Sequence, residues 1–374
     1  MGVGWVFSAI KVKDIFVYSF ASVICVAFLI LFTKPLHIHL TAKGHNSSAP
    51  QRSHTVPTPR IGGLTLVIGY GVGMSFLSPD VFEMALILGV STIPVFLGGL
   101  GEDTGFDVSP IRRLLLSFVS AAMAAVLFNT WITDTGLNAL WFLTYGPVIS
   151  LIFTIILSGG IAHAVNLIDG LNGLAMGVTM LIAGGLAGLA YSVGDTTILT
   201  LCGVVLASVA GLFVFNFPIG KIFLGDAGAY SMGHLLTWIG ILLLSRNPQI
   251  APFSVMLMFF WPVMDMLFAI ARRLIRGRSV SQPDRLHFHQ LVMRAIELVV
   301  LGQKNKKLAN PLATLVVLPM AALPVIAAQF VYETDRMSVY AFLAFMALFI
   351  LTFLVGIYCA RRYAKVGKRR SLHQ

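Results

Sequence analysis

The chain has 374 residues, of which 57% are hydrophobic and 11% are charged, and its formal net charge is +11. Soluble globular proteins carry roughly 25% charged residues, so this composition excludes a soluble enzyme. Each membrane crossing needs about 20 apolar residues, so the chain can supply roughly ten transmembrane helices. Its apolar runs are continuous rather than alternating, which excludes a membrane β-barrel. We therefore predict an all-α polytopic membrane protein.

Eleven apolar windows predict about eleven transmembrane helices. They lie at residues 15–33, 62–79, 82–101, 113–132, 138–159, 173–193, 196–215, 228–245, 250–271, 311–331 and 337–360. The first window is longer than the apolar region of a secretory signal peptide, which has about 7–15 residues, and no clear cleavage site follows it. We therefore expect an anchor that stays in the protein.

The distribution of Lys and Arg orients these helices. If the C-terminal tail lies in the cytoplasm, the segments on the same side are 34–61, 102–112, 160–172, 216–227 and 272–310. All but four of the 26 Lys and Arg lie in these segments, in the tail or directly beside them. The positive-inside rule then places the N-terminus outside and the C-terminus in the cytoplasm. Basic residues beside an anionic leaflet account for the net charge, so no nucleic-acid partner is expected.

No internal repeat or separate soluble domain is recognisable, so residues 1–374 are expected to form a single integral-membrane domain. The longest polar stretch, 272–310, is too short for an independent fold. Apolar residues recur in it near helical spacing: Leu286, Leu291, Val292, Ala295, Leu298 and Val299. This spacing predicts an amphipathic helix on the membrane surface.

Residues 98–107 form a glycine-rich loop with three carboxylates. Glu102 and Asp103 are adjacent, and Asp107 follows four residues on. A solvated loop of acids explains this pattern about as well as a binding site does. The functional interpretation is a divalent-metal and phosphate site, because Mg²⁺ usually binds one or two carboxylates plus substrate phosphates.

Residues 166–173 form a loop without Lys or Arg, so topology does not explain its composition. Asn166, Asp169 and Asn172 recur every three residues. The two glycines of the loop permit close approach of a ligand to the backbone. We favour a ligand-binding loop over a plain turn.

Residues 216–228 begin with Asn216 and carry Asp226 directly between Gly225 and Ala227, before an apolar helix. Asp226 alone fits an ordinary helix N-cap. Three polar loops on one side of the membrane favour a shared ligand site instead.

The long basic loop contains Arg285, His287 and His289. Two histidines at i and i+2 suggest zinc, but no third His or Cys lies nearby in the sequence, so a zinc site is disfavoured. Imidazole and guanidinium groups are better suited to phosphate or sugar oxygens.

Asp265 lies inside the ninth window, where an ionisable residue is costly and is therefore a functional candidate. Arg272 and Arg273 follow two helical turns later. An ion pair near the cytoplasmic end of the helix explains Asp265 at least as well.

Together these motifs resemble those of the polyprenyl-phosphate N-acetylhexosamine-1-phosphate transferases. These belong to glycosyltransferase family 4 and are distant relatives of the phospho-N-acetylmuramoyl-pentapeptide translocase. The resemblance runs from about residue 50 to residue 294. It rests on the segment HTVPTPRIGG at 54–63, Glu102 and Asp103, residues 166–173, residues 225–228, Asp265 and residues 283–285.

The resemblance implies transfer of a sugar 1-phosphate from a UDP-N-acetylhexosamine, UDP-GlcNAc first, to undecaprenyl phosphate, with release of UMP. It implies Mg²⁺ as cofactor, with Mn²⁺ as the alternative. The product would begin a cell-surface polysaccharide such as O-antigen, in lipopolysaccharide or cell-wall synthesis. The expected location is the bacterial inner membrane with the active site on the cytoplasmic face, and a homodimer is left open.

The resemblance also implies roles for single residues. Asp226 is the expected metal ligand. Asp103 either assists it or, with Glu102, activates the lipid phosphate. Asp169 is the third catalytic acid, on the nucleoside side. The expected substrate-binding residues are Arg60, Asn166, Asn172, Asn216, Arg285, His287 and His289.

Two positions depart from the family pattern. Glu102 replaces the first of two aspartates, which keeps the charge but moves the oxygens by about 1.5 Å. Gln290 replaces the final histidine of the usual cluster and removes a cationic donor. An N-acetylhexosamine other than GlcNAc therefore stays open.

Two other interpretations also stay open. A secondary transporter would show carboxylates near the bilayer midplane and internally related halves, whereas the acids here lie in loops or toward one end of a window. A homologue with impaired catalysis would bind the nucleotide sugar without turnover, and the changes at Glu102 and Gln290 favour that reading.

Overall fold

The computed structural model describes residues 2–36, 58–277, 286–301 and 305–371, and these ranges contain helices but no strand. The helices are α1 (Gly2–Phe32), α3 (Gly62–Met74), α4 (Pro79–Asp103), α5 (Pro110–Phe128), α6 (Gly146–Leu167), α7 (Leu174–Ser192), α8 (Thr196–Asn216), α9 (Gly225–Arg246), α10 (Pro252–Met258), α11 (Phe260–Ile275), α12 (Phe288–Ala295), α13 (Lys306–Val331) and α14 (Asp335–Ser371). Two short segments are the 3₁₀ helix η2 (Asn138–Thr144) and the π-helical turn η3 (Ile296–Val300). The all-α prediction is confirmed for these residues.

Most of the helices are suited to a membrane. In the described part of the chain, nine helices are long and apolar enough to cross one. The α10 and α11 pair forms a further candidate that is bent by 80°, and α3 is a shorter apolar helix of 13 residues. Each of the eleven predicted windows therefore falls on at least one helix, and the protein is a multi-pass membrane protein.

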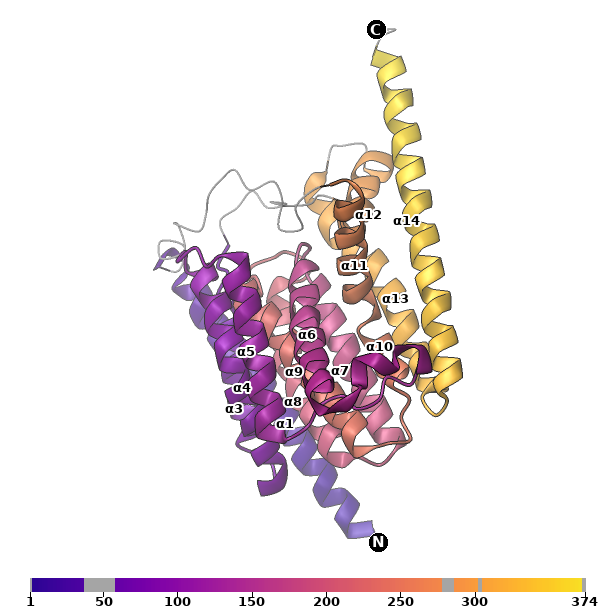
Figure 1. The fold of residues 1–374 in the computed structure, drawn as a ribbon. Helices are drawn as coiled ribbons and strands as arrows, with labels where there is room; N and C mark the ends of the chain where they lie inside the picture. Colours follow the sequence, from indigo (N-terminus) through magenta and orange to yellow (C-terminus); the bar gives the residue numbers. More distant parts are fainter. Residues whose placement is uncertain (1, 37–57, 278–285, 302–304, 372–374) are drawn as a thin grey trace.

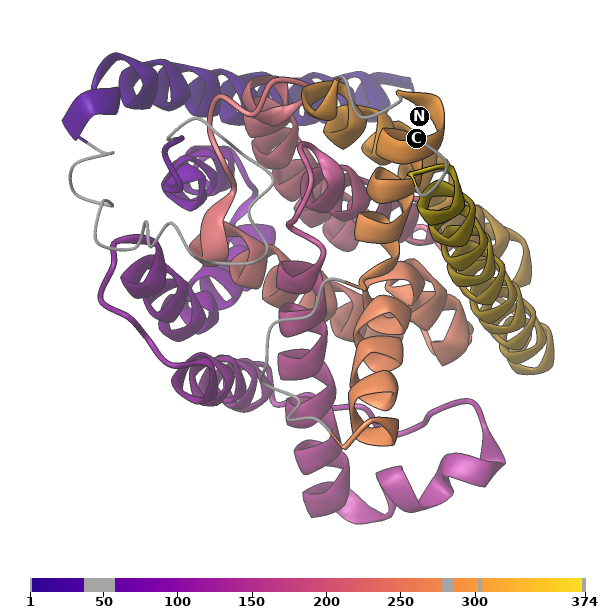
Figure 2. The same cartoon turned by 90° about the horizontal axis from the view of Figure 1, so that it is seen from above.

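The expected helix over residues 138–159 was wrong at its start. Residues 138–144 form η2, and α6 begins only at Gly146, which has φ of +80°. Such a φ is outside the helical range and is readily adopted only by glycine, so it interrupts the helix. Trp141 and Tyr145 beside this break are exposed, and the magenta segment that carries them lies at the edge of the bundle in the end-on view (Figure 2).

Helix α9 occupies the centre of the bundle. Its residues from Gly225 to Leu243 are all buried, and it packs against α3, α4, α6, α7 and α8. A Cβ atom added to Gly233 would lie 2.6 Å from the Cα of Ala162, so α6 approaches α9 as closely as glycine allows. Small residues at such crossings bring membrane helices into close contact. Helix α9 is therefore packed closely against α6 near Gly233.

The two ends of the chain lie at opposite ends of the bundle (Figure 1). Helix α1 begins at one end, and α14 extends past the other end beyond the remaining helices. The C-terminal end of α4 and the N-terminal end of α9 meet at the end toward which α14 runs. The polar loops singled out in the sequence are connected to the helices at this end.

A short helix occupies part of the predicted amphipathic stretch. Helix α12 covers Phe288–Ala295 and contacts α13 and α14. Leu291 and Val292 pack against the core of the bundle, whereas Arg294 and Ala295 are exposed. The helix is thus two-sided, and its placement on the membrane surface stays a prediction.

Candidate active site

A short backbone pairing brings the segment before α3 to the segment before α9. Phe223 donates its N–H to the carbonyl of Pro59 at 2.9 Å, and its own carbonyl accepts the N–H of Gly62 at 3.0 Å. The N–H of Gly63 reaches the carbonyl of Leu224 at 2.9 Å. This pairing places Arg60 directly beside the first turn of α9.

Asp103 is the last residue of α4 and caps α9 from outside that helix. Its Oδ1 accepts the N–H of Asp226 at 3.0 Å, and its Oδ2 accepts the N–H of Ala227 at 2.9 Å. The first N–H groups of a helix have no partner within it, so a carboxylate there is favourable in both hydrogen bonding and charge. Thr104 is the C-cap of α4, and the helix ends there because Gly105 has φ of +83°, in the left-handed region.

Gly225 is required at this junction. Its φ is +76°, and a Cβ atom there would lie 2.1 Å from the carbonyl oxygen of Arg60 and 2.5 Å from Oδ2 of Asp103. Any other residue would be strained in its backbone and would push these two groups apart. The glycine before Asp226 thus allows three elements to converge on one point.

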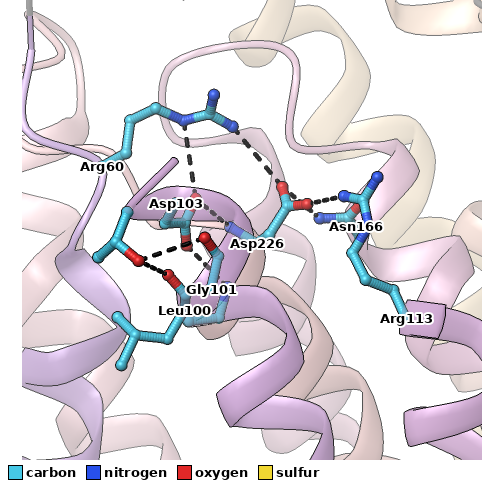
Figure 3. A network of polar contacts seen from close by, with 9 residues as sticks. Arg60, Leu100, Gly101, Asp103, Arg113, Asn166 and Asp226 are labelled. Atoms are coloured by element: carbon cyan, nitrogen blue, oxygen red, sulfur yellow. Dashed lines mark hydrogen bonds and ion pairs between the residues drawn. The ribbon is translucent and has the colours of Figure 1, made fainter. Parts of the chain in front are cut away.

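Asp226 is the centre of the resulting cluster (Figure 3). Its Oδ1 lies 3.6 Å from a terminal nitrogen of Arg60 and accepts a hydrogen bond from Nδ2 of Asn166 at 3.1 Å. A terminal nitrogen of Arg113 binds its Oδ2 from the other side. Nε of Arg60 also lies 3.7 Å from Asp103. The segment before α3, helix α5 and helix α6 therefore contribute guanidinium or amide groups to one buried carboxylate.

Asp169 lies in the loop between α6 and α7, and the charges of Arg60 and Asp226 affect its pKa. Burial raises its pKa to about 7, while Arg60 opposes this shift and Asp226 adds to it. For Arg60, burial lowers the pKa, but the carboxylates of Asp103, Asp226 and Asp169 raise it above its usual value. A carboxyl group that titrates near neutral pH is suited to take and release a proton.

Glu102 directly precedes Asp103 but does not share its hydrogen bonds to α9. Its Oε2 is buried and has no hydrogen-bond partner among the described residues. A buried carboxyl oxygen without a partner is costly. This oxygen therefore points to a ligand contact at the end of α4.

Asn172 and Asn216 tie loops together. Nδ2 of Asn172 donates to the carbonyl of Pro218 at 2.8 Å, and its backbone N–H donates to Asn310 of α13 at 2.8 Å. Nδ2 of Asn216 donates to the carbonyl of Ile222 at 2.7 Å, and its Oδ1 accepts the N–H of Gly173. Both polar atoms of Asn216 are thus engaged by backbone. Oδ1 of Asn172 has no hydrogen-bond partner in the described ranges.

His287 and His289 meet at Asp265. Nδ1 of each ring lies 3.3 Å from Oδ2 of Asp265, and all three side chains are buried. The alternative of an ion pair between Asp265 and Arg272 or Arg273 was wrong. Arg272 instead lies over the ring of Phe353. Arg285 and residues 54–57 of the first motif lie outside the described residues.

Comparison with known proteins places the chain in a family. The model of glycosyl transferase family 4 matches residues 85–244. A probable undecaprenyl-phosphate N-acetylglucosaminyl 1-phosphate transferase of Bacillus subtilis is 31% identical over 255 residues, which cover 65% of this chain and 68% of that protein. The chain belongs to glycosyl transferase family 4.

Two further relatives align over more of this family 4 chain. Undecaprenyl-phosphate alpha-N-acetylglucosaminyl 1-phosphate transferases of Yersinia pestis and of Escherichia coli K12 are 28% and 26% identical. Each alignment covers 326 residues, 85% of this chain and 84% of the relative. The family membership inferred from the motifs is thereby confirmed.

The family match and the contacts together delimit the site of this family 4 protein. Matched residues 85–244 contain the α4 acids, the 166–173 loop and Asp226. Arg60, Asp265 and the two histidines lie outside that match, yet Arg60 contacts Asp103 and Asp226. The predicted grouping of Arg60, Asp103, Asn166 and Asp226 is observed as direct contact.

Arg113 is the residue that sequence reasoning missed. It lies ten residues after Asp103. In the sequence it was interpreted only as a positive charge at the end of a helix, which orients the helix in the membrane. In the family 4 fold it lies in the first turn of α5 and binds Asp226. Its Nε is buried without a hydrogen-bond partner among the described residues. Adjacent arginines directly after an acidic loop were the available signal.

The cluster suits a metal ion that arrives with its substrate. No three His, Cys, Asp or Glu side chains in the described ranges form a group that could hold a metal ion by themselves. Mg²⁺ commonly uses one or two carboxylates and completes its shell with waters and substrate phosphates. Asp226 and Asp103 supply two carboxylates, and Glu102 has a buried oxygen without a partner. These donors fit such an ion.

Proposed function

We propose that the protein transfers a sugar 1-phosphate from a UDP-N-acetylhexosamine, UDP-GlcNAc first, to undecaprenyl phosphate and releases UMP. The observation that carries this proposal is the convergence of Arg60, Arg113 and Asn166 on Asp226, beside Asp103. Cationic donors and carboxylates within one cluster match a diphosphate together with a divalent cation. The similarity to undecaprenyl-phosphate N-acetylglucosaminyl 1-phosphate transferases supports the same reaction.

Arg60 and Arg113 are the proposed anion-binding groups. Both arginines contact the Asp226 carboxylate. A diphosphate offers stronger, bidentate acceptors for guanidinium groups. Binding of the nucleotide sugar would therefore draw the arginines to phosphate oxygens and free Asp226 for the cation.

The chemistry is a displacement at phosphorus. An oxygen of the lipid phosphate forms a bond to the sugar-linked phosphorus, and the bond from that phosphorus to the bridging oxygen breaks. UMP leaves with the bonding electron pair, and the lipid carries a diphosphate-linked sugar. Bound Mg²⁺, or Mn²⁺ as the alternative, would supply charge neutralisation on the diphosphate.

The acids have separate proposed tasks. Asp226 would hold the cation with Asp103, which also fixes the first turn of α9. Asp103, with Glu102, would activate the lipid phosphate, and Asp169, whose pKa is raised to about 7, would accept or release a proton on the nucleoside side. Glu102 would assist from the mouth of α4, where its free oxygen is buried.

The remaining predicted residues would surround the donor substrate. Asn166, in the last turn of α6, and Asn172, in the loop that follows, would face the nucleoside, and Asn216 keeps that loop in place through Gly173. His287, His289 and Arg285 would contact the diphosphate or the sugar. The oxygens of these substrates accept hydrogen bonds from such groups.

We also propose eleven crossings, with the N-terminus outside and the C-terminus in the cytoplasm of a bacterial inner membrane. An odd number of crossings agrees with chain ends at opposite ends of the bundle (Figure 1). The cluster would then lie on the cytoplasmic face, where a soluble nucleotide sugar meets a lipid phosphate. The product would begin a cell-surface polysaccharide such as O-antigen.

The test uses the purified protein in detergent with undecaprenyl phosphate, Mg²⁺ and a panel of UDP-N-acetylhexosamines. UMP release that requires both the lipid and the metal is expected, and it is expected to be lost in Asp226→Asn. Release without lipid, or none from any donor while the sugar nucleotide still binds, would contradict the proposed transfer.

A further inference from the structure

Asp265 lies on α11, outside the cluster at Asp226, and its carboxylate is 1% exposed. Its Oδ1 accepts the backbone N–H of Phe288 at 3.0 Å, and its Oδ2 accepts a hydrogen bond from Nδ1 of His289 at 3.3 Å. Nδ1 of His287 lies 3.3 Å from the same oxygen. One carboxylate therefore holds the start of α12 and the imidazole of His289, and the imidazole of His287 lies beside it.

The two imidazoles are arranged alike. Their planes differ by 20° and their centroids are 5.7 Å apart. His287 is 2% exposed and His289 is fully buried, so neither ring is free to turn in solvent. Because Nδ1 of each ring is directed at Asp265, Nε2 of each ring lies on the side away from that carboxylate.

Nε2 of His289 points at the loop that carries Asp169. A Cβ atom added to Gly170 would lie 2.8 Å from this nitrogen. The nitrogen is buried and has no hydrogen-bond partner among the described residues. Leaving a buried polar atom unsatisfied is costly, which indicates that a ligand completes the contact.

We propose that Asp265 is a positioning residue that orients His287 and His289 for the donor substrate. Its hydrogen bond to Nδ1 of His289 directs Nε2 of that ring to Gly170, and its Oδ2 also lies 3.3 Å from Nδ1 of His287. This inference rests on the proposed function, because the phosphate or sugar oxygens of the nucleotide sugar are the groups that would meet these nitrogens. A carboxylate on the far nitrogen of an imidazole fixes its tautomer and raises its basicity.

The informative variant is Asp265→Asn. Asparagine keeps the shape and can still accept the N–H of Phe288, but its amide N–H₂ would donate to Nδ1 and impose the opposite tautomer. In a histidine–carboxylate pair this exchange leaves the geometry intact and presents the wrong tautomer. The matched control is Asp195→Asn. Asp195 is also a buried acid; it lies at the start of α8 and forms an ion pair with Arg246.

The first readout needs no substrate. Nitrogen-15 spectra of histidine-labelled protein report which ring nitrogen carries the proton, and His287→Gln and His289→Gln assign the signals. Wild type is expected to carry a proton on Nδ1 of His289, whereas Asp265→Asn is expected to shift that ring to the Nε2–H form. Unchanged tautomers in Asp265→Asn would overturn the proposal, whatever the activity of the enzyme.

The second readout is UMP release, separated into kcat and KM for the donor. Asp265→Asn is expected to lower kcat/KM by about 10- to 100-fold, as for other partners that orient an imidazole. Asp195→Asn is expected to change neither parameter. A tautomer shift with unchanged kcat and KM would overturn the link to the substrate.

A second variant tests the same contact in case Asp265→Asn fails to fold. Gly170→Ala places a methyl group against Nε2 of His289 without touching Asp265. It is expected to lower kcat/KM as much as His289→Gln does. Phe288 lies 5.0 Å from Trp261, so unchanged Trp261 fluorescence will show that α12 stays in place. Full activity of Gly170→Ala would contradict the proposal.

Discussion

Asp103 and Asp226 are 123 residues apart, yet the carboxylate of the first accepts the backbone N–H of the second at 3.0 Å. The end of α4 is thereby fastened to the start of α9, and the side chain of Asp226 is directed at Arg60 and Arg113. The two acids can lie this close because both oxygens of Asp103 accept backbone N–H groups. Asp103 therefore mainly supports the start of α9, whereas the side chain of Asp226 is the functional group.

Asp103→Asn is expected to abolish UMP release and to lower the melting temperature in detergent. The amide would turn an N–H₂ donor toward one of the two N–H donors of α9, and a lost hydrogen bond to a charged group costs about 1.5–3 kcal/mol. Thermal unfolding and the UMP assay measure the two effects. Asp107→Asn, at an exposed position of the same loop, is the control. An Asp103→Asn protein with wild-type stability would refute the capping role.

Much of this arrangement was predictable from residue patterns. Continuous apolar windows predicted the helices. Asp103, Asn166 and Asp226 were recognised because they lie in polar segments whose composition the orientation of the helices does not explain. The contacts between these segments were not predictable, because each depends on how distant helices pack. Asn216 illustrates this limit, since its amide binds the backbone at Gly173 and Ile222. Arg113 was overlooked because a charge near a helix end also serves topology.

Arg113→Gln is expected to lower kcat/KM for the nucleotide sugar by about 10- to 100-fold, because it removes a charge-assisted contact to the diphosphate. Steady-state kinetics of UMP release over a range of donor concentrations will measure this. The matched control is Arg112→Gln, since Arg112 is exposed and adjacent. Equal losses in the two variants would show that general positive charge matters rather than the contact with Asp226.

The raised pKa of Asp169 predicts that kcat/KM depends on pH near neutrality. Its pKa is raised to about 7, so its charged form is expected to appear as pH rises through neutrality, and kcat/KM should rise with it. Asp169→Asn is expected to lose this rise. A profile of UMP release from pH 5.5 to pH 8.5 measures it. An unchanged profile in Asp169→Asn would exclude Asp169 as the titrating group.

The same shift has a consequence for stability. The folded protein binds this proton more tightly than the unfolded chain, whose aspartate pKa is about 3.9. The free energy of unfolding should therefore fall as pH rises between about 4 and 7. Asp169→Asn removes this contribution, so the variant should gain stability relative to wild type between pH 5 and pH 8. Thermal unfolding at both pH values tests the sign.

Glu102→Asp restores the more usual acid of the family but is expected to reduce activity here. The Oε2 atom of Glu102 is buried without a partner, which indicates that the site is built around its present position. Shortening the side chain by one methylene withdraws the oxygens by about 1.5 Å, and misplacement of about 1 Å can cost about 10²-fold in rate. UMP release at saturating lipid and donor measures the effect. Glu102→Gln, which keeps the length and removes the charge, separates position from charge. Faster turnover in Glu102→Asp than in wild type would instead show that the site has drifted from an aspartate optimum.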